Sequence, residues 1–203
     1  MTLQCGAGLR CVSLLALGLT MVACSRRSGA GAGTVSVTEH RVGPFIIDST
    51  VGALLKASPN AERTTVPGEF KEYPALRLSL PGAEILVQQF GETLNTSRPG
   101  DSWHVSGANI LLPDNLTIRS TWGDFRRAYG RGAGSIGENI DEASYVFCKL
   151  PHFIFKVPTA GADSTADLRN PASIPDSTHL VEFSILRTVW RLAADTCDSI
   201  KAP

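Results

Sequence analysis

The sequence has no excess of either charge, since its 203 residues include 19 Lys and Arg and 19 Asp and Glu. Proteins that bind nucleic acid carry a basic surface, so the balance argues against a nucleic-acid partner. Hydrophobic residues make up 43% and charged residues 19% of the chain, which excludes a disordered or fibrous protein. The length suits one ordinary domain or two very small ones.

The common motifs of enzymes and metal sites are also missing. No G-x-S-x-G or H-E-x-x-H occurs. The four histidines lie far apart from one another, so the chain has no compact zinc motif; they are His40, His104, His152 and His179. We therefore predict no enzymatic activity, no cofactor and no metal ion. A hydrolase whose catalytic groups meet only in the fold is the open alternative, because such a cluster leaves no local trace.

Two local patterns resemble ligand sites but lack the neighbouring elements or the spacing that such sites need. Gly132-Ala-Gly-Ser-Ile-Gly137 fits G-x-G-x-x-G, but a dinucleotide site needs a strand before the glycines and a helix after them. Here a predicted helix precedes, which indicates a glycine-rich helix exit. Glu138, Asp141 and Glu142 could offer oxygens to Ca²⁺, yet they lack the spacing of an EF-hand loop. We predict an acidic surface turn.

The N-terminus predicts export. The apolar run Cys11–Ala23 is 13 residues long, too short to span about 30 Å of hydrocarbon but typical of a signal peptide. It ends in Met21-Val-Ala-Cys24, which resembles the bacterial lipobox. The resemblance implies removal of residues 1–23 and acylation, palmitate included, at Cys24, with Ser25 favouring the outer membrane. A plain signal peptide with a coincidental cysteine is the alternative.

The rest of the chain reads as two copies of one unit. Ile47–Pro59 and Ile118–Gly130 match at six positions with an offset of 71 residues. Each copy predicts a short helix with a threonine N-cap, Thr50 and Thr121. The predicted organisation is a flexible tether at 24–34, repeat unit one at 35–112, repeat unit two at 113–192 and a C-terminal tail at 193–203.

The patterns predict an α+β fold, with a largely antiparallel sheet made of two strand–helix–hairpin–strand units and both helices on one side. Alternating leucines around Pro81-Gly82 favour one hairpin. A second hairpin is predicted about Pro151-His152, so that Leu150-Pro151 would correspond to Leu80-Pro81. We predict loop over 60–71. The polar connection 158–179 is long enough to be functional or disordered, and disorder is the favoured prediction.

Cys148 and Cys197 are predicted to form a disulfide. Export places them in an oxidising compartment, and they are the only thiols left once the signal peptide is removed and Cys24 is acylated. The alternative is a buried Cys148 that acts as a small hydrophobe and a free Cys197 in a frayed tail.

Several segments resemble a family of small outer-membrane lipoproteins regulated by sigma-E and built on a domain of unknown function. The resemblance is carried by Leu112–Ile118, Trp122–Phe125, Ala128–Gly130, Val146–Lys149 and Trp190-Arg191. More distantly, the helix-and-strand pattern is similar to β-lactamase-inhibitor-like modules and to a small lipoprotein of the barrel-assembly machinery, both of which bind proteins.

The predicted function is that of a bacterial outer-membrane lipoprotein on the periplasmic side, acting as a non-catalytic protein-binding module. Its expected partners are the membrane, through the lipid, and an envelope protein. The alternative is a structural or stress-response lipoprotein without a dedicated ligand.

Overall fold

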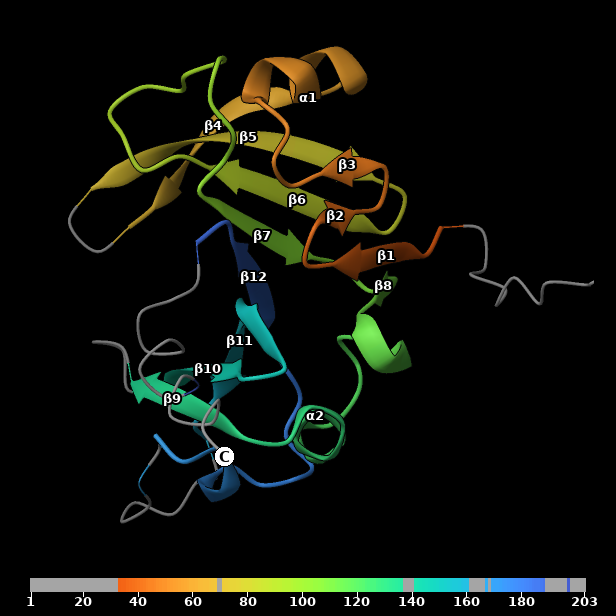
Figure 1. The fold of residues 1–203 in the computed structure, drawn as a ribbon, viewed down its shortest axis with the longest axis vertical. Helices are drawn as coiled ribbons and strands as arrows, with labels where there is room; N and C mark the ends of the chain where they lie inside the picture. The colour runs from red at the N-terminus through yellow and green to blue at the C-terminus, as the bar shows by residue number, and fades with distance from the viewer. Residues whose placement is uncertain are drawn as a thin grey trace, which may run out of the picture. The chain divides into compact units, whose positions relative to one another are not determined.

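The computed structural model describes residues 33–68, 71–136, 141–160, 167, 169–188 and 197. In this part of the chain the fold is mostly β, with twelve strands in two sheets and two short α helices (Figure 1). The predicted α+β class is therefore wrong. The α helices span only seven and eight residues, while segments predicted as loops pair as further strands.

The larger sheet has eight strands in the order β4-β5-β6-β7-β12-β11-β10-β9, and every neighbouring pair is antiparallel. Its strands are β4 (Glu62–Pro67), β5 (Glu72–Leu80), β6 (Ala83–Gln88), β7 (Ser102–Ser106), β9 (Gly132–Ile136), β10 (Glu142–Phe147), β11 (Leu150–Pro158) and β12 (Glu182–Leu186).

The smaller sheet has the order β3-β2-β1-β8 and contains one parallel pair, β1 with β8. Its strands are β1 (Val35–Thr38), β2 (Arg41–Val42), β3 (Phe45–Ile46) and β8 (Ile110–Leu111). The helices are α1 (Val51–Ala57), α2 (Trp122–Tyr129) and the 3-10 turns η1 (Pro113–Asn115) and η2 (Pro171–Ser173).

One order of elements occurs twice in the larger sheet. A helix followed by a four-strand antiparallel meander is formed first by α1 and β4–β7, then by α2 and β9–β12. We call these the first and second halves. They join where β7 pairs with β12, in a register centred on His104 opposite Ser184. We call this pair the axis of the sheet, because counting strands outward from it gives each strand of one half a counterpart in the other.

Both α helices begin as predicted. The Thr50 side chain accepts a hydrogen bond from the Ala53 N–H at the start of α1. The Thr121 side chain accepts one from the Asp124 N–H, and Asp124 returns a bond to the Thr121 N–H, which completes a capping box at α2. Gly130 follows α2 with φ 71°, a conformation that glycine adopts without steric cost.

The two central hairpins differ from the prediction in one place. Pro81-Gly82 forms the β5–β6 turn, where Leu80 pairs with Ala83. The β10–β11 turn lies at Cys148-Lys149, because Phe147 pairs with Leu150. Pro151 and His152 are inside β11, so the predicted turn there is wrong, and so is the equivalence of Leu80-Pro81 with Leu150-Pro151.

Three further predictions, for segments expected to be loop or disordered, are wrong. The expected loop 60–71 contains the edge strand β4, and the glycine-rich segment after α2 forms the opposite edge strand β9. Residues 169–179, expected to be disordered, are held against the second half: Trp122 N–H donates to Thr178 O at 2.6 Å and Gly134 N–H donates to Arg169 O at 2.8 Å.

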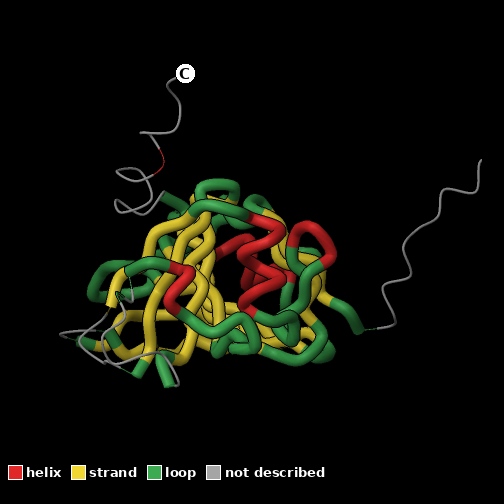
Figure 2. The backbone as a smooth tube through the Cα atoms, turned by 90° about the horizontal axis from the view of Figure 1, so that it is seen from below, coloured by secondary structure: helices red, strands yellow, loops and turns green. Residues whose placement is uncertain are grey.

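A single apolar core lies on one face of the larger sheet. It contains inward-facing strand residues of both halves, the buried faces of α1 and α2, and side chains of the smaller sheet. Figure 2 shows helical segments, in red, with strands on both sides of them. Because side chains alternate along a strand, every second residue of the larger sheet points to the other face, which we call the outer face.

Candidate functional site

The predicted lipid-attachment residue lies outside the described part of the chain. Cys24, the signal peptide and almost all of the tether fall within residues 1–32, for which the structure gives no description. Lipidation at Cys24 therefore stays a prediction. No helix among the described residues is long and apolar enough to cross a membrane.

The structure places Cys148 and Cys197 as a disulfide-bonded pair, with Cα atoms 5.3 Å apart. This separation is within the range of about 4.4–6.8 Å that protein disulfides require. Cys148 occupies the β10–β11 turn, so a bond to Cys197 connects the C-terminal tail to the edge of the second half.

The glycine pattern does not form a nucleotide site in the described residues. Gly132 and Gly134 lie in β9, where a Cβ on Gly134 would come within 2.3 Å of the Tyr145 ring. These glycines allow close strand packing rather than a loop at a helix N-terminus. Glu142 begins β10, whereas Gly137 and Glu138 lie outside the described ranges. No group of three or more described His, Cys, Asp or Glu residues could hold a metal ion.

Two of the four histidines line the same pocket. His40 and His152 both line a pocket of about 110 Å³, together with Glu39, Asp48 and Arg187. His152 Nδ1 lies 2.9 Å from the carbonyl oxygen of Leu186 at the end of β12. The pocket is far below the size of about 300–1,000 Å³ that ligand sites have.

A buried polar cluster occupies the centre of the outer face. His104 Nδ1 lies 2.9 Å from Ser184 Oγ, and its Nε2 lies 2.8 Å from Gln88 Oε1 and 3.4 Å from Ser102 Oγ. Burial lowers the pKa of His104, and Lys156 acts in the same direction while Glu182 opposes it. A neutral ring that donates from Nε2 and accepts at Nδ1 satisfies both nitrogens.

This cluster has the residue types of a hydrolytic site but not the access. Ser102 is 2% exposed and Ser184 is 4% exposed, so neither hydroxyl can meet a substrate in this conformation. The cluster sits on the axis between the halves and joins β6, β7 and β12. Its hydrogen bonds satisfy polar groups that would otherwise be costly to bury.

Ion pairs lie on both sides of the cluster. On the first half Arg77 contacts Glu62 at 3.5 Å and Glu84 at 3.4 Å. On the second half Lys156 pairs with Glu182. Each positive charge is thus neutralised locally, and the outer face gives no large field of one sign.

An aromatic corner stands where the outer face meets the edge of the first half. We define it as Val66, Tyr73 and Phe90. Val66 pairs with Tyr73 across β4 and β5, and the Tyr73 and Phe90 rings meet edge to face with centroids 5.6 Å apart. Phe90 is 55% exposed. Large apolar side chains at such exposure are the usual contacts of protein interfaces.

The adjacent edge strand β4 presents backbone groups without a partner. Gly68 N–H donates to Lys71 O at 2.9 Å, and alternation along an antiparallel pair then directs the amides of Val66 and Thr64 toward β5. The amides of Arg63 and Thr65 therefore point outward. Among the described residues neither has a hydrogen-bond partner for its backbone N–H.

At the opposite edge of the sheet, strand β9 forms a backbone hydrogen bond to another segment of the chain. Following the ladder outward from the axis, Arg63 of β4 corresponds to Gly134 of β9. Gly134 N–H donates to Arg169 O of the chain's own 169–179 segment. Figure 1 shows β4 and β9 at the two ends of the sheet. One edge thus receives a bond from its own chain, while in the described part of the chain its counterpart stays open beside the aromatic corner.

The comparisons with known proteins concern the fold alone. No family model matches the chain, and no curated protein matches it. The crystal structure of the uncharacterized protein YfeY from Escherichia coli is similar with a TM-score of 0.51 at 10% sequence identity. The similarity covers 76% of this chain and 99% of that one. The fold thus occurs in an uncharacterised bacterial protein.

Proposed function

We propose that the chain is a bacterial envelope protein, anchored in the outer membrane by a lipid on Cys24, that binds a protein partner and catalyses no reaction. The partner segment is extended and adds to β4 as a further strand. The observation that carries this proposal is the open edge of β4 next to the aromatic corner, at the position where the second half uses its own chain.

The geometry of the β4 edge supports a particular chemistry for the partner segment. Main-chain bonds to Arg63 and Thr65 supply affinity, and side chains at alternate positions supply specificity. On the outer side these side chains would meet Val66 and the half-exposed ring of Phe90, which favours apolar residues in every second position. We infer that the partner is an envelope protein with such a segment.

Anchoring is tested by replacing Cys24 with Ala and fractionating the cells. Acyl chains contribute about 0.8 kcal/mol per buried CH₂ group, so the wild type should sediment with outer membranes and Cys24→Ala should not. Cys5→Ala is the matched control, because Cys5 precedes the apolar run. Mass spectrometry that finds an unmodified Cys24 in a soluble wild-type product would refute the anchor.

Strand addition is tested with a photo-crosslinking amino acid at position 90 in intact cells. We expect a defined adduct there and none at position 46, where Ile46 is 48% exposed on β3 of the smaller sheet. Thr65→Pro should abolish the adduct while the protein stays folded, because it removes an outward amide and the exposed Thr65–Glu72 side-chain hydrogen bond but no bond of the β4–β5 ladder. Thr64→Pro is the contrasting variant, since it breaks the β4–β5 ladder. An adduct that survives Thr65→Pro would rule out strand addition.

A further inference from the structure

A pocket of about 330 Å³ lies at the C-terminal end of α2. One wall is formed by Arg126 and by the Gly130–Gly132 connection into β9, and the other by Asn170, Pro171 and Ala172 at η2. Its volume lies at the lower end of the range for small-molecule sites, about 300–1,000 Å³. Nothing in the open-edge proposal uses this pocket.

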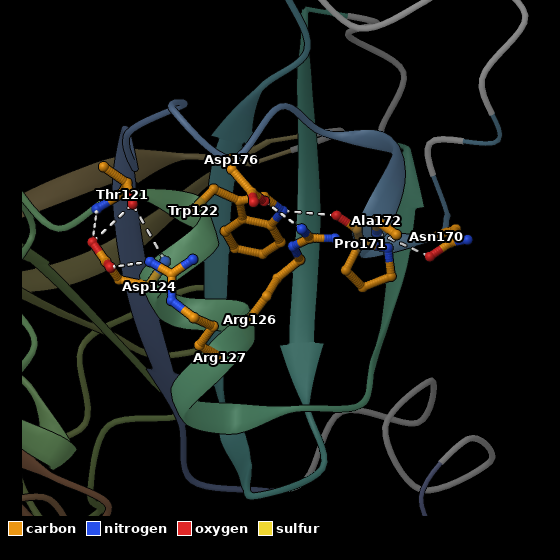
Figure 3. A network of polar contacts seen from close by, with 9 residues as sticks. All are labelled: Thr121, Trp122, Asp124, Arg126, Arg127, Asn170, Pro171, Ala172 and Asp176. Carbon is orange, nitrogen blue, oxygen red and sulfur yellow. Dashed lines mark hydrogen bonds and ion pairs between the residues drawn. The ribbon is translucent and has the colours of Figure 1, made fainter.

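The two walls are fixed to each other by polar contacts (Figure 3). Trp122 Nε1–H donates to Pro171 O at 2.8 Å, and Arg126 forms an ion pair with Asp176. Gly123 N–H donates to Asp176 O at 3.0 Å. A Cβ on Gly123 would lie 2.8 Å from the Asp176 Cγ, so the glycine permits this approach. The pocket is therefore formed before any ligand arrives, which lowers the entropic cost of binding.

The lining is cationic. Arg126 and Arg131 carry the only charges among the described residues that line the pocket. Asp176 engages the Nη2 of Arg126, but the buried Nε–H of the same guanidinium has no acceptor in the described part of the chain. Because this nitrogen is buried from solvent, an oxyanion in the pocket would meet the part of the Arg126 side chain that is exposed, 28% of its surface.

The C-terminal end of a helix, where this pocket lies, carries a partial negative charge that disfavours a bound anion. That effect is worth about 0.3–1 kcal/mol and fades within one turn. Asp176 offsets the charge of Arg126, so Arg131 leaves one net positive charge at the pocket, which exceeds this partial charge. The Arg131 guanidinium can bind an oxyanion through two parallel N–H bonds. The net preference of the pocket is for an anion.

The first half shows that the fold does not need these arginines. The counterparts of Arg126 and Arg131, 71 positions earlier, are Leu55 and Asn60, in and just after a helix with the same threonine cap. The positive lining belongs to the second half alone. We propose that the pocket binds a small ligand through a carboxylate or phosphate group, held by Arg126 and Arg131.

The test follows the indole N–H signal of Trp122 in the ¹⁵N-labelled full chain during separate titrations with inorganic phosphate and acetate. This indole donates to the pocket wall at Pro171, so a bound anion should shift its signal saturably. The anion that saturates the signal identifies a phosphoryl or a carboxylate ligand. If neither anion gives a saturable shift, the site does not exist.

Variants separate specific binding from a general charge effect. Arg131→Gln, at an exposed position, should weaken binding at least tenfold while leaving the rest of the spectrum in place. Arg127→Gln is the matched control, because Arg127 lies on the same helix, pairs with Asp124 and does not line the pocket. It should change the affinity less than twofold. Equal weakening by both variants would overturn the proposal.

Discussion

The two halves of the larger sheet share their backbone hydrogen bonds around the helix but differ in their core side chains. In each half the first two amides of the helix donate to a loop that leads into the last strand: Val51 and Gly52 to Arg98 O and Thr96 O, Trp122 and Gly123 to Thr178 O and Asp176 O. The caps pair with the same loops, Thr50 with Pro99 and Thr121 with His179. Backbone contacts at equivalent places therefore fix the helices in both halves.

At several equivalent core positions the side chains belong to different classes, although Trp103 and Phe183 beside the axis are both aromatic. Five aliphatic residues of the first half correspond to five aromatic residues of the second. They are Leu54 with Phe125, Leu76 with Tyr145, Leu78 with Phe147, Ile85 with Phe153 and Val87 with Phe155. Three pairs follow from the strand ladder, Leu78 and Phe147 lie two residues further along β5 and β10, and Leu54 and Phe125 are related by the 71-residue offset. Main-chain pairing therefore defines this fold, and aliphatic and aromatic side chains both fill its core.

The loops are ordered by different means as well. In the first half the buried amide of Gln89 donates to Asn95 O, Arg98 O and Pro99 O at 3.0–3.1 Å. In the second half the Trp122 indole and the Arg126–Asp176 pair hold residues 171–176. The loop of the first half is held by a side chain that follows strand β6, and the loop of the second half by side chains of helix α2. Among the described residues the cationic pocket lies beside the second loop.

The largest expected effect tests the difference between the cores. Phe125→Ala should lower the free energy of unfolding by about 3–5 kcal/mol, because the buried ring contacts Tyr129 and Phe155. Leu54→Ala at the equivalent position should cost less, about 2–4 kcal/mol. Urea unfolding measures both. Because β7 and β12 join the halves in one sheet, each variant should unfold in a single transition. Two separate transitions would show that the halves unfold independently.

The second effect concerns the disulfide, which has no counterpart in the first half. Replacing Cys148 and Cys197 by Ser should lower the free energy of unfolding by up to about 4 kcal/mol, the chain-entropy value for a separation of 49 residues. Reductant should destabilise the wild type equally and leave the double variant unchanged. Equal stability of the wild type with and without reductant would show that the tail adds nothing to the second half.

The sequence predicts those parts of the fold that rest on local signals. Thr121 followed by Asp124 is sufficient to place the start of α2, and Pro81-Gly82 is sufficient to place a turn. Strand β9 could not be predicted in this way. Its glycines are poor strand formers, and what keeps them extended is close packing against β10, where a Cβ on Gly132 would lie 2.4 Å from Val146 O.

The candidate site was even less visible in the sequence. Its corner joins Val66, Tyr73 and Phe90, which meet only through strand pairing. The polar content of 60–71 favoured a loop, although Thr64-Thr65-Val66 is a run of β-branched strand formers that could have indicated β4. The anion pocket likewise joins α2 to a segment about 45 residues further along the chain, a distance that spacing rules do not reach.

A smaller effect compares the two caps. Thr121→Ala should lower the free energy of unfolding by about 1–2 kcal/mol and Thr50→Ala by about 0.5–1 kcal/mol. The difference arises because Thr121 takes part in a full capping box with Asp124, whereas Thr50 accepts a single bond of 3.2 Å. Ser at either position keeps the oxygen and should restore most of the loss. Equal costs for both alanine variants would mean that the box adds nothing.

The smallest expected effect concerns the axis itself, where His104 faces Ser184. Burial lowers the pKa of His104 from 6.5, so the unfolded chain takes up a proton at a higher pH than the folded protein does. Stability should then be constant above about pH 6.5 and fall as the pH drops from there toward the folded pKa. The carboxylate of Glu182 opposes the shift and the ammonium of Lys156 adds to it. His104→Gln should make the urea unfolding midpoint nearly independent of pH across this range. His179→Gln, at an exposed position, should keep the wild-type dependence of the midpoint on pH. If His104→Gln retains the wild-type slope, the histidine is not buried as a neutral ring between the halves.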